Sequence, residues 1–221
     1  MYFIGERQTG KTNLVAWLIS QMPHIRIIVF DTLGQISRAF RDWKPPKLEI
    51  IVPTWDIDVN CKKNELDPRL IAAFKSACVK AWKQGNTILV VDEIHLFCSK
   101  KKTLPNFLSI IINLGGNHNV SLWFTSQRAA QVHNDLLAAC RHHFIFRLSL
   151  RNDLDQLADN VNKEIVFGEK APDGTIKREG VKKLKKYHFL YYQPSINISD
   201  GLEDDNEPEN PQFCAPVKQM Y

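Results

Sequence analysis

A glycine-bordered motif near the start of the chain has the residue types and spacing of a phosphate-binding loop. The segment MYFIGERQTGKTNL contains the pattern G-x-x-x-x-G-K-T. In such a loop, backbone N–H groups hold phosphate oxygens, the lysine reaches the outer phosphates and the hydroxyl binds Mg²⁺. We therefore expect ATP as cofactor, with Thr12 as a metal ligand and Lys11 also acting in catalysis. The predicted cofactor-binding residues are Gly5, Glu6, Arg7, Gln8, Thr9, Gly10, Lys11, Thr12 and Asn13.

Two adjacent acids follow the apolar run ILVV, as Asp92 and Glu93. An enzyme with a phosphate loop needs an acid at the tip of a neighbouring strand to hold Mg²⁺, and hydrolysis needs a carboxylate that polarises water. Asp92 fits the metal-binding role and Glu93 the catalytic role. A kinase acting on a small acceptor can lack the second acid, so Glu93 favours hydrolysis. Two acids that merely begin a helix are the structural alternative.

Two further polar residues are candidates for catalysis. Gln127 ends the run VSLWFTSQ, where its side chain could touch the γ-phosphate or the attacking water; a simple polar strand end is the alternative. An arginine that stabilises the transition state from a neighbouring subunit would require an oligomer. Arg151, just past a predicted strand, is our choice for that arginine. The other candidates are Arg128, Arg141 and Arg147.

The elements that must position these residues alternate along the chain. Apolar runs predict strands, and apolar residues at intervals of three and four predict helices between them. This alternation predicts an α/β fold, with a mostly parallel sheet that has helices on both faces. The predicted strands are 1–4, 26–30, 48–52, 87–91, 120–125 and 144–148, and the predicted helices are 11–22, 34–40, 67–84, 104–114 and 134–140.

The pattern changes after the predicted ATPase core of residues 1–162. Residues 163–199 are predicted to form a C-terminal β-hairpin extension, with strands at 164–167 and 188–192 and a basic run between them. Residues 200–221 are acidic and proline-rich, and we expect this tail to be disordered or to dock onto a partner. The three segments define the expected domain organisation.

Charge and composition restrict the class of partner. Without the acidic tail the chain has 28 basic and 18 acidic side chains, a net charge of about +10, which favours polyanions as partners. The lysines at 100–102 and 182–186 could contact nucleic acid or form a solvated face. No run of about eighteen apolar residues could span a bilayer, and no secretory signal is visible, so we expect a cytoplasmic protein without a stable membrane span.

Over residues 1 to about 162 the chain resembles the FtsK–HerA superfamily of DNA-pumping P-loop ATPases. GERQTGKTNL is similar to the phosphate loop of that family, ILVVDEIH to its Asp-Glu strand and FTSQR to its Thr-x-Gln-Arg sensor. LLAACRHHFIFRLSLRNDLDQL is similar to the stretch that leads from a last core strand to an arginine. The resemblance implies a RecA-like core, a hexameric ring of identical subunits, ATP hydrolysis and translocation of double-stranded DNA.

The chain differs from cellular members of that superfamily at its start, where only four residues precede the loop instead of a domain. This compact form is more like the genome-packaging ATPases of tailless icosahedral viruses with internal membranes. The resulting hypothesis is an ATP-driven translocase that packages viral double-stranded DNA into a capsid. Its expected partners are DNA, further copies of the chain and a capsid or virion membrane protein, in the host cytoplasm or on the virion.

Two alternatives remain open from the sequence. One is a phage morphogenesis ATPase resembling the zonula-occludens-toxin family, whose members usually carry a membrane span after the ATPase core. The other is a small-molecule kinase, which would need an arginine-rich lid and an acceptor pocket. Neither the span nor the lid is recognisable in this sequence.

Overall fold

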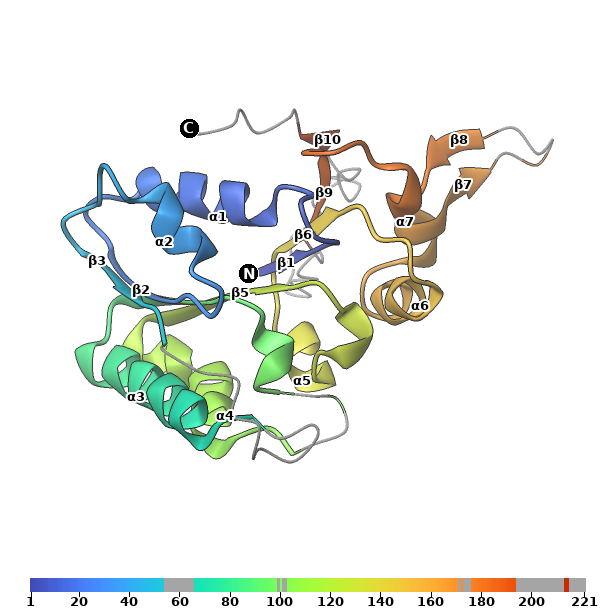
Figure 1. The fold of residues 1–221 in the computed structure, drawn as a ribbon. Coiled ribbons are helices and arrows are strands. Elements are labelled where there is room, and N and C mark those ends of the chain that lie inside the picture. The colour runs from blue at the N-terminus through green and yellow to red at the C-terminus, as the bar shows by residue number, and fades with distance from the viewer. Residues whose placement is uncertain are drawn as a thin grey trace, which may run out of the picture.

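One eight-stranded sheet organises the chain in the computed structural model, which describes residues 1–53, 66–98, 100, 103–170, 172, 176–193 and 213–214 (Figure 1). The strand order is β10-β9-β6-β1-β5-β4-β2-β3. The six strands from β1 to β6 are parallel, whereas β9 is antiparallel to β6, and β10 to β9. The strands are β1 (Tyr2–Ile4), β2 (Arg26–Phe30), β3 (Leu48–Ile51), β4 (Thr87–Val91), β5 (Val120–Ser126), β6 (His143–Phe146), β9 (Phe189–Tyr192) and β10 (Phe213–Cys214).

Helices cover both faces of the sheet, as predicted. Figure 1 shows α1 and α2 on one face and α3 and α4 on the other. The helices that follow the strands of the parallel series are α1 (Lys11–Ser20), α2 (Gln35–Ala39), α3 (Pro68–Gln84), α4 (Asn106–Leu114) and α5 (Asn134–Ala138). Single turns of 3₁₀ helix lie at η1 (Ile94–Leu96), η2 (Gly115–His118), η3 (Ala129–Gln131) and η4 (Val181–Lys183).

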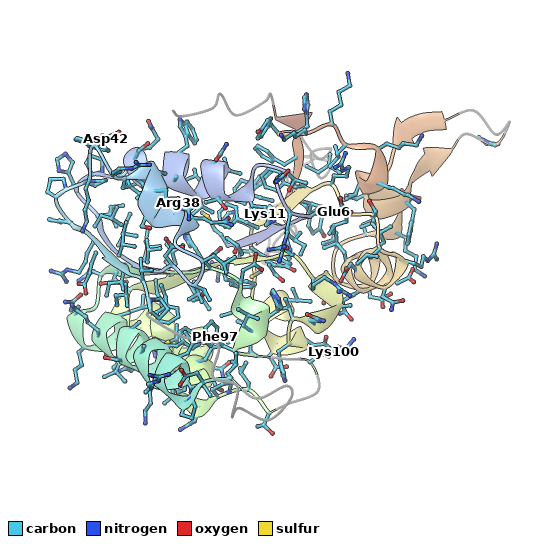
Figure 2. All side chains as sticks on the ribbon, in the orientation of Figure 1. Glu6, Lys11, Arg38, Asp42, Phe97 and Lys100 are labelled. Atoms are coloured by element: carbon cyan, nitrogen blue, oxygen red, sulfur yellow. The ribbon has the colours of Figure 1, made fainter. Side chains whose placement is uncertain are left out.

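The central strands are buried on both faces because their side chains alternate between two apolar layers. In β2, Ile27 belongs to the layer that also contains α1, and Ile28 to the layer that contains α3 and α4. In β4, Ile88 and Leu89 divide in the same way. Phe97 packs in the α3 layer, as Figure 2 shows. The continuous apolar runs of the sequence therefore correspond to buried parallel strands, which confirms the predicted α/β fold class.

The parallel arrangement brings the carboxyl ends of the strands to one edge of the sheet. Ile4 is in register with Ser126 on β5, and Val91 on β4 is in register with Phe124. The loop after β1 therefore lies at the same edge as the residues that follow β4 and β5. This edge carries the candidate site.

The structure after β6 differs from the sequence prediction in two helices. Helix α6 (Arg151–Asn160) was not predicted, and α7 (Lys163–Phe167) occupies residues for which a strand was predicted. The strand prediction for 164–167 is wrong because the Asn162 side chain caps a helix: its Oδ1 accepts from the backbone N–H of Glu164 at 2.6 Å and of Ile165 at 3.4 Å. A short apolar run such as this one suits either element.

A C-terminal hairpin is present, but other residues form it. Its strands are β7 (Gly168–Lys170) and β8 (Ile176–Glu179), an antiparallel pair that projects away from the main sheet in Figure 1. The strand predicted at 188–192 is confirmed as β9, which pairs with β6 instead of with the hairpin. Apart from Phe213–Cys214 in β10, the predicted disorder of 200–221 concerns residues outside the described part of the chain.

Among the residues that the structure describes, no helix has both the length and the apolar character needed to cross a membrane.

Candidate nucleotide-binding site

The two glycines that border the loop are required by close approach of other residues. A Cβ atom on Gly5 would lie 2.5 Å from the Cβ of Phe146, and one on Gly10 would lie 2.9 Å from the Cδ1 of Tyr187. Gly10 also has a φ of 111°, in the left-handed region that glycine adopts readily. It is the N-cap of α1, and as a glycine it has no side chain with which to cap that end of the helix. The free N–H groups of α1 therefore face the pocket, where they suit an anion.

Lys11 is folded back over the loop that it follows. Its Nζ donates to the carbonyl oxygen of Gly5 at 2.6 Å and to that of Glu6 at 2.8 Å, and its exposed fraction is 7%. Burial lowers the pKa of Lys11 to about 8, although the charges of Glu93 and other acids oppose this shift. The ammonium is thus held in the pocket by carbonyl oxygens that phosphate oxygens can replace.

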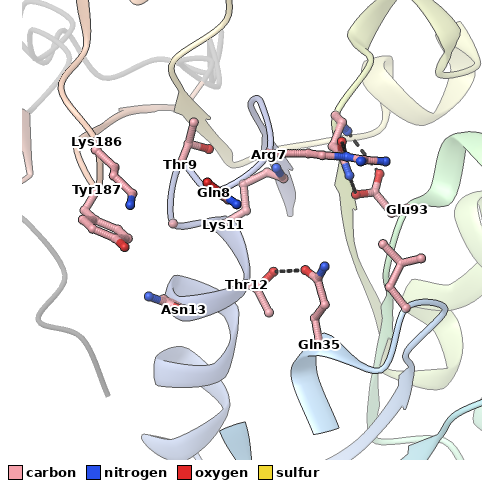
Figure 3. A pocket seen from close by; sticks show the side chains of 13 residues that line it. Arg7, Gln8, Thr9, Lys11, Thr12, Asn13, Gln35, Glu93, Lys186 and Tyr187 are labelled. Atoms are coloured by element: carbon pink, nitrogen blue, oxygen red, sulfur yellow. Dashed lines mark hydrogen bonds between the residues drawn. The ribbon is translucent and has the colours of Figure 1, made fainter. Parts of the chain in front are cut away.

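A pocket of about 790 Å³ lies over this loop (Figure 3). One wall is Arg7 to Asn13, so the loop residues predicted to bind the cofactor line it, apart from Gly5 and Glu6. Gly5 lies beneath the loop, and Glu6 contributes its carbonyl oxygen to Lys11. The rest of the lining comes from distant parts of the chain: Leu33, Gln35, Glu93, Gln127, Lys186 and Tyr187.

Helix α2 brings Gln35 to the predicted metal ligand Thr12. The Thr12 hydroxyl donates to Gln35 Oε1 at 3.4 Å. Asp31, at the end of β2, holds the start of α2 in place, since its carboxylate accepts from the backbone N–H groups of Gln35 at 3.0 Å and Ser37 at 2.7 Å. Asp31 follows β2, the strand beside β4, and its bonds to the start of α2 therefore fix the position of Gln35.

Asp92 lies behind the pocket wall and has one carboxylate oxygen to spare. Its Oδ1 accepts from the Thr125 hydroxyl at 2.7 Å, whereas Oδ2 has no hydrogen-bond partner among the described residues. Asp92 is only 2% exposed, and this burial raises its pKa to about 7, with the Thr125 hydrogen bond acting in the opposite direction. A buried carboxylate oxygen without a hydrogen-bond partner is a suitable ligand for a hard cation. The site therefore fits Mg²⁺, for which Thr12 and Asp92 remain the predicted ligands.

Glu93 is held in a network that points it into the pocket. Gln127 donates to both of its carboxylate oxygens: the backbone N–H to Oε2 at 3.2 Å and the side-chain amide to Oε1. The Nδ1 atom of His95 lies 3.2 Å from Oε2. Burial raises the pKa of Glu93, but the hydrogen bonds from His95 and Gln127, with the charges of His95 and Lys11, hold that pKa below its ordinary value. The carboxylate is thus ionised and oriented, as a group that polarises water must be.

Arg7 joins this network through its side chain. Its Nε donates to Gln127 Oε1 at 2.9 Å, so Arg7, Gln127 and Glu93 connect the loop in series to the ends of β4 and β5. Figure 3 shows Arg7 extending from the loop toward Glu93. The sequence indicated only a backbone role for Arg7. The structure adds a guanidinium group beside the predicted catalytic pair.

Arg151 is not part of this pocket. It is the first residue of α6, its Nε lies 2.9 Å from Asp155 Oδ1, and its guanidinium lies 4.8 Å from the ring centroid of Phe167. The structure thus brings together Lys11, Glu93 and Gln127 from the predicted catalytic set and places Arg151 elsewhere on the surface. An arginine that acts on the site of a neighbouring copy is compatible with that position.

Four pocket residues were missed by sequence reasoning. Leu33 and Gln35 follow β2, and the rule that parallel strands end at one edge would have found them. Lys186 belongs to a lysine run for which the sequence suggested contact with nucleic acid. No sequence pattern indicated Tyr187 as a pocket residue, because it precedes an antiparallel strand. Of the other lysine run, Lys100 donates to the side-chain oxygen of Gln156, and residues 101–102 lie outside the described residues.

Residues 1–149 match the family model described as "ATPase family associated with various cellular activities (AAA)". No curated protein matches the chain in sequence.

The fold is similar to several solved structures of a viral protein. The genome packaging NTPase B204 from Sulfolobus turreted icosahedral virus 2, in complex with sulfate, has a TM-score of 0.62 and 18% identity, covering 87% of this chain and 89% of that one. The same protein in complex with ATP-gammaS has a TM-score of 0.60 and 19% identity, covering 87% and 90%. B204, the DNA-packaging ATPase from Sulfolobus turreted icosahedral virus, has a TM-score of 0.61 and 16% identity over the same shares. At these identities the similarity establishes the fold.

Proposed function

The chain belongs to the ATPase family associated with various cellular activities, and from this premise we propose that its ATP hydrolysis drives double-stranded DNA into a viral capsid. ATP binding and hydrolysis follow from the family together with the phosphate loop and its two acids. The DNA substrate and the packaging role are the proposal.

The chain's own residues have separate roles in the hydrolysis step. The loop N–H groups and Lys11 bind the triphosphate, and Glu93 takes a proton from the attacking water while Gln127 keeps the carboxylate oriented. Thr12 and Asp92 would hold Mg²⁺, which, when bound, neutralises charge on the phosphates. Arg7, next to Gln127, adds positive charge at the same end of the pocket.

The observation that carries the packaging proposal is the extent of the similarity to B204. The shared fold covers 87% of this chain and 89% of that protein, which is more of the chain than the residues 1–149 that match the AAA family. B204 is a genome packaging NTPase. A chain of similar size that keeps the same architecture and an intact hydrolytic site suits the same task.

Charge supports a polyanionic substrate. The chain without its acidic tail has a net charge of about +10, and Lys182, Lys183 and Lys185 are exposed beside the nucleotide pocket's Lys186. Exposed lysines neutralise phosphates without reading sequence, which suits a protein that must move along DNA of any sequence. We propose these lysines as DNA contacts.

Assembly into a ring is part of the proposal. Arg151 is exposed and outside its own pocket, so a neighbouring copy could place its arginine at the γ-phosphate. We propose a homo-oligomer, with a hexamer as the expected size, acting in the host cytoplasm at a capsid or virion membrane protein.

Steady-state ATPase assays with and without duplex DNA test the proposal. We expect phosphate release to rise when long duplex DNA is added, and to disappear in Glu93→Gln with or without DNA. Because DNA binding by lysines is electrostatic, the stimulation should weaken as salt increases. Hydrolysis that requires Glu93 but does not respond to DNA would leave an ATPase and exclude a DNA translocase.

A further inference from the structure

Lys186 and Tyr187, which precede β9, lie directly against the phosphate loop. The backbone N–H of Tyr187 donates to the carbonyl oxygen of Thr9 at 3.0 Å, and the tyrosine ring leaves no room for a side chain on Gly10. Both residues line the pocket. Figure 3 shows them on the side of the loop opposite Glu93. A segment from the far end of the described chain therefore closes one end of the nucleotide pocket.

The backbone of Tyr187 is strained in a way that points to a function. Its φ is 66°, in the left-handed region that bulky residues rarely adopt. The turn is held by the bond to Thr9 and by the His188 N–H, which donates to the Lys185 carbonyl oxygen at 3.1 Å. A large aromatic residue at such a position costs free energy that glycine or asparagine would avoid, and strain of this kind clusters at ligand sites.

The two ends of the pocket differ in chemistry. Lys11, Glu93 and Gln127 make one end charged and polar, as the triphosphate and the attacking water require. At the other end, beside Lys186, Tyr187 is the one aromatic residue among the described residues that line the pocket. A nucleoside triphosphate has the same polarity, with charge at one end and a flat aromatic base at the other.

We propose that Tyr187 is the platform on which the purine base of the bound nucleotide stacks, so that the nucleotide extends from Tyr187 toward Glu93. The inference rests on the nucleotide binding described above and adds a base subsite. The ring belongs to a residue that precedes the sheet strand β9. The Lys186 ammonium lies over the ring, 4.9 Å from its centroid, so it must move aside for a base on that face, and it then supplies positive charge for the phosphate nearest the base. Stacking of a base on an aromatic side chain contributes about 1–3 kcal/mol.

Two variants separate the ring from the backbone that carries it. Tyr187→Asn removes the ring and keeps a residue that tolerates positive φ, so the turn against Thr9 is preserved. Tyr187→Phe is the matched control, because it keeps the ring and removes only the hydroxyl. Both are made in the Glu93→Gln background, where binding is measured without hydrolysis.

Calorimetric titration with ATP and with inorganic tripolyphosphate, each with Mg²⁺, tests the platform. We expect Tyr187→Asn to weaken ATP binding about tenfold or more, and to change tripolyphosphate binding by less than about twofold. Tyr187→Phe should bind both ligands as the parent does. An unchanged affinity for ATP in Tyr187→Asn, or an equal loss for both ligands, would overturn the base platform alone. If the parent bound neither ligand, the nucleotide site itself would be overturned.

Discussion

Gln127 holds Glu93 by both carboxylate oxygens, with its backbone N–H 3.2 Å from Oε2 and its side-chain amide bonded to Oε1. The two residues follow the neighbouring parallel strands β5 and β4. Because each donor stabilises the ionised form, the carboxylate is both charged and fixed in direction. Glu93 can therefore accept a proton from water in a fixed direction, while the positive charges around it also favour its ionised form.

Replacing Glu93 by glutamine should separate binding from hydrolysis. The amide keeps the size of the side chain and removes the proton acceptor, so we expect phosphate release to fall by about 10²- to 10⁴-fold. ATP affinity, measured by calorimetry, should be retained because the loop and Lys11 are unchanged. Activity within about tenfold of the parent would contradict the role of Glu93 as the base.

The pH dependence of hydrolysis should report the contact between Gln127 and Glu93. A base acts when deprotonated, so activity increases as pH rises through the pKa of Glu93. Burial raises that pKa, and hydrogen bonds from His95 and Gln127 lower it below its ordinary value. Gln127→Ala removes one donor to the charged form, so the acidic limb of the kcat/KM profile should move to higher pH.

Gln131→Ala is the matched control for this profile, because Gln131 is an exposed glutamine four positions away on η3. Its acidic limb should coincide with that of the parent. A Gln127→Ala enzyme with reduced activity and an unshifted limb would show that Gln127 acts on the phosphate and not on Glu93.

Asp92→Asn should stabilise the protein at high pH when Mg²⁺ and nucleotide are absent. Burial raises the pKa of Asp92 from 3.8 to about 7, so the folded protein holds a proton that the unfolded chain releases, and folding stability is lost as pH rises between these values. At pH 8 the asparagine avoids burial of an uncompensated charge, and we expect the free energy of unfolding to increase by about 2–4 kcal/mol. The gain should vanish near pH 4.

Urea denaturation at several pH values measures this effect, with Asp159→Asn as the control because that aspartate is exposed. Mg²⁺ with a non-hydrolysable ATP analogue should stabilise the parent and have little effect on Asp92→Asn. Equal stabilisation of both proteins by the metal complex would show that Asp92 is not a ligand.

Arg151 can be tested by mixing two inactive variants. Arg151→Ala leaves its own pocket intact, and Lys11→Ala leaves its own Arg151 intact. If Arg151 acts on a neighbouring subunit, Arg151→Ala alone should lose about 10³- to 10⁵-fold in turnover. Lys11→Ala alone should also be inactive, and mixed oligomers should recover part of the activity. Mixtures that stay as inactive as the separate variants would remove Arg151 from the catalytic set.

A stability measurement distinguishes this functional loss from unfolding. The ion pair of Arg151 with Asp155 is exposed, so Arg151→Ala should change the free energy of unfolding by less than about 0.5 kcal/mol. Arg128 provides the contrast, since its Nε pairs at 3.0 Å with Asp153, which is fully buried. Arg128→Ala should cost about 2–3 kcal/mol because it leaves a buried carboxylate without its charged partner.

Local patterns predicted the parallel core and the charged end of the site. A phosphate loop is a continuous segment, and Asp92 and Glu93 follow a strand whose apolar run shows that it is buried on both faces. The wrong predictions concern segments whose local pattern suits a helix and a strand equally well. Residues 164–167 are apolar enough for a strand, and only the cap from Asn162 makes them helical.

Sequence by itself determined the α/β class, the phosphate loop and the pair of acids. These features depend on the periodicity of apolar side chains and on motifs whose residues are only a few positions apart in the sequence. Only the tertiary structure decided that Gln127 binds Glu93 and that Tyr187 closes the pocket over Gly10. Those contacts join residues 34 and 177 positions apart. They depend on how strands and loops that are distant in sequence pack together in the folded chain, which no local pattern records.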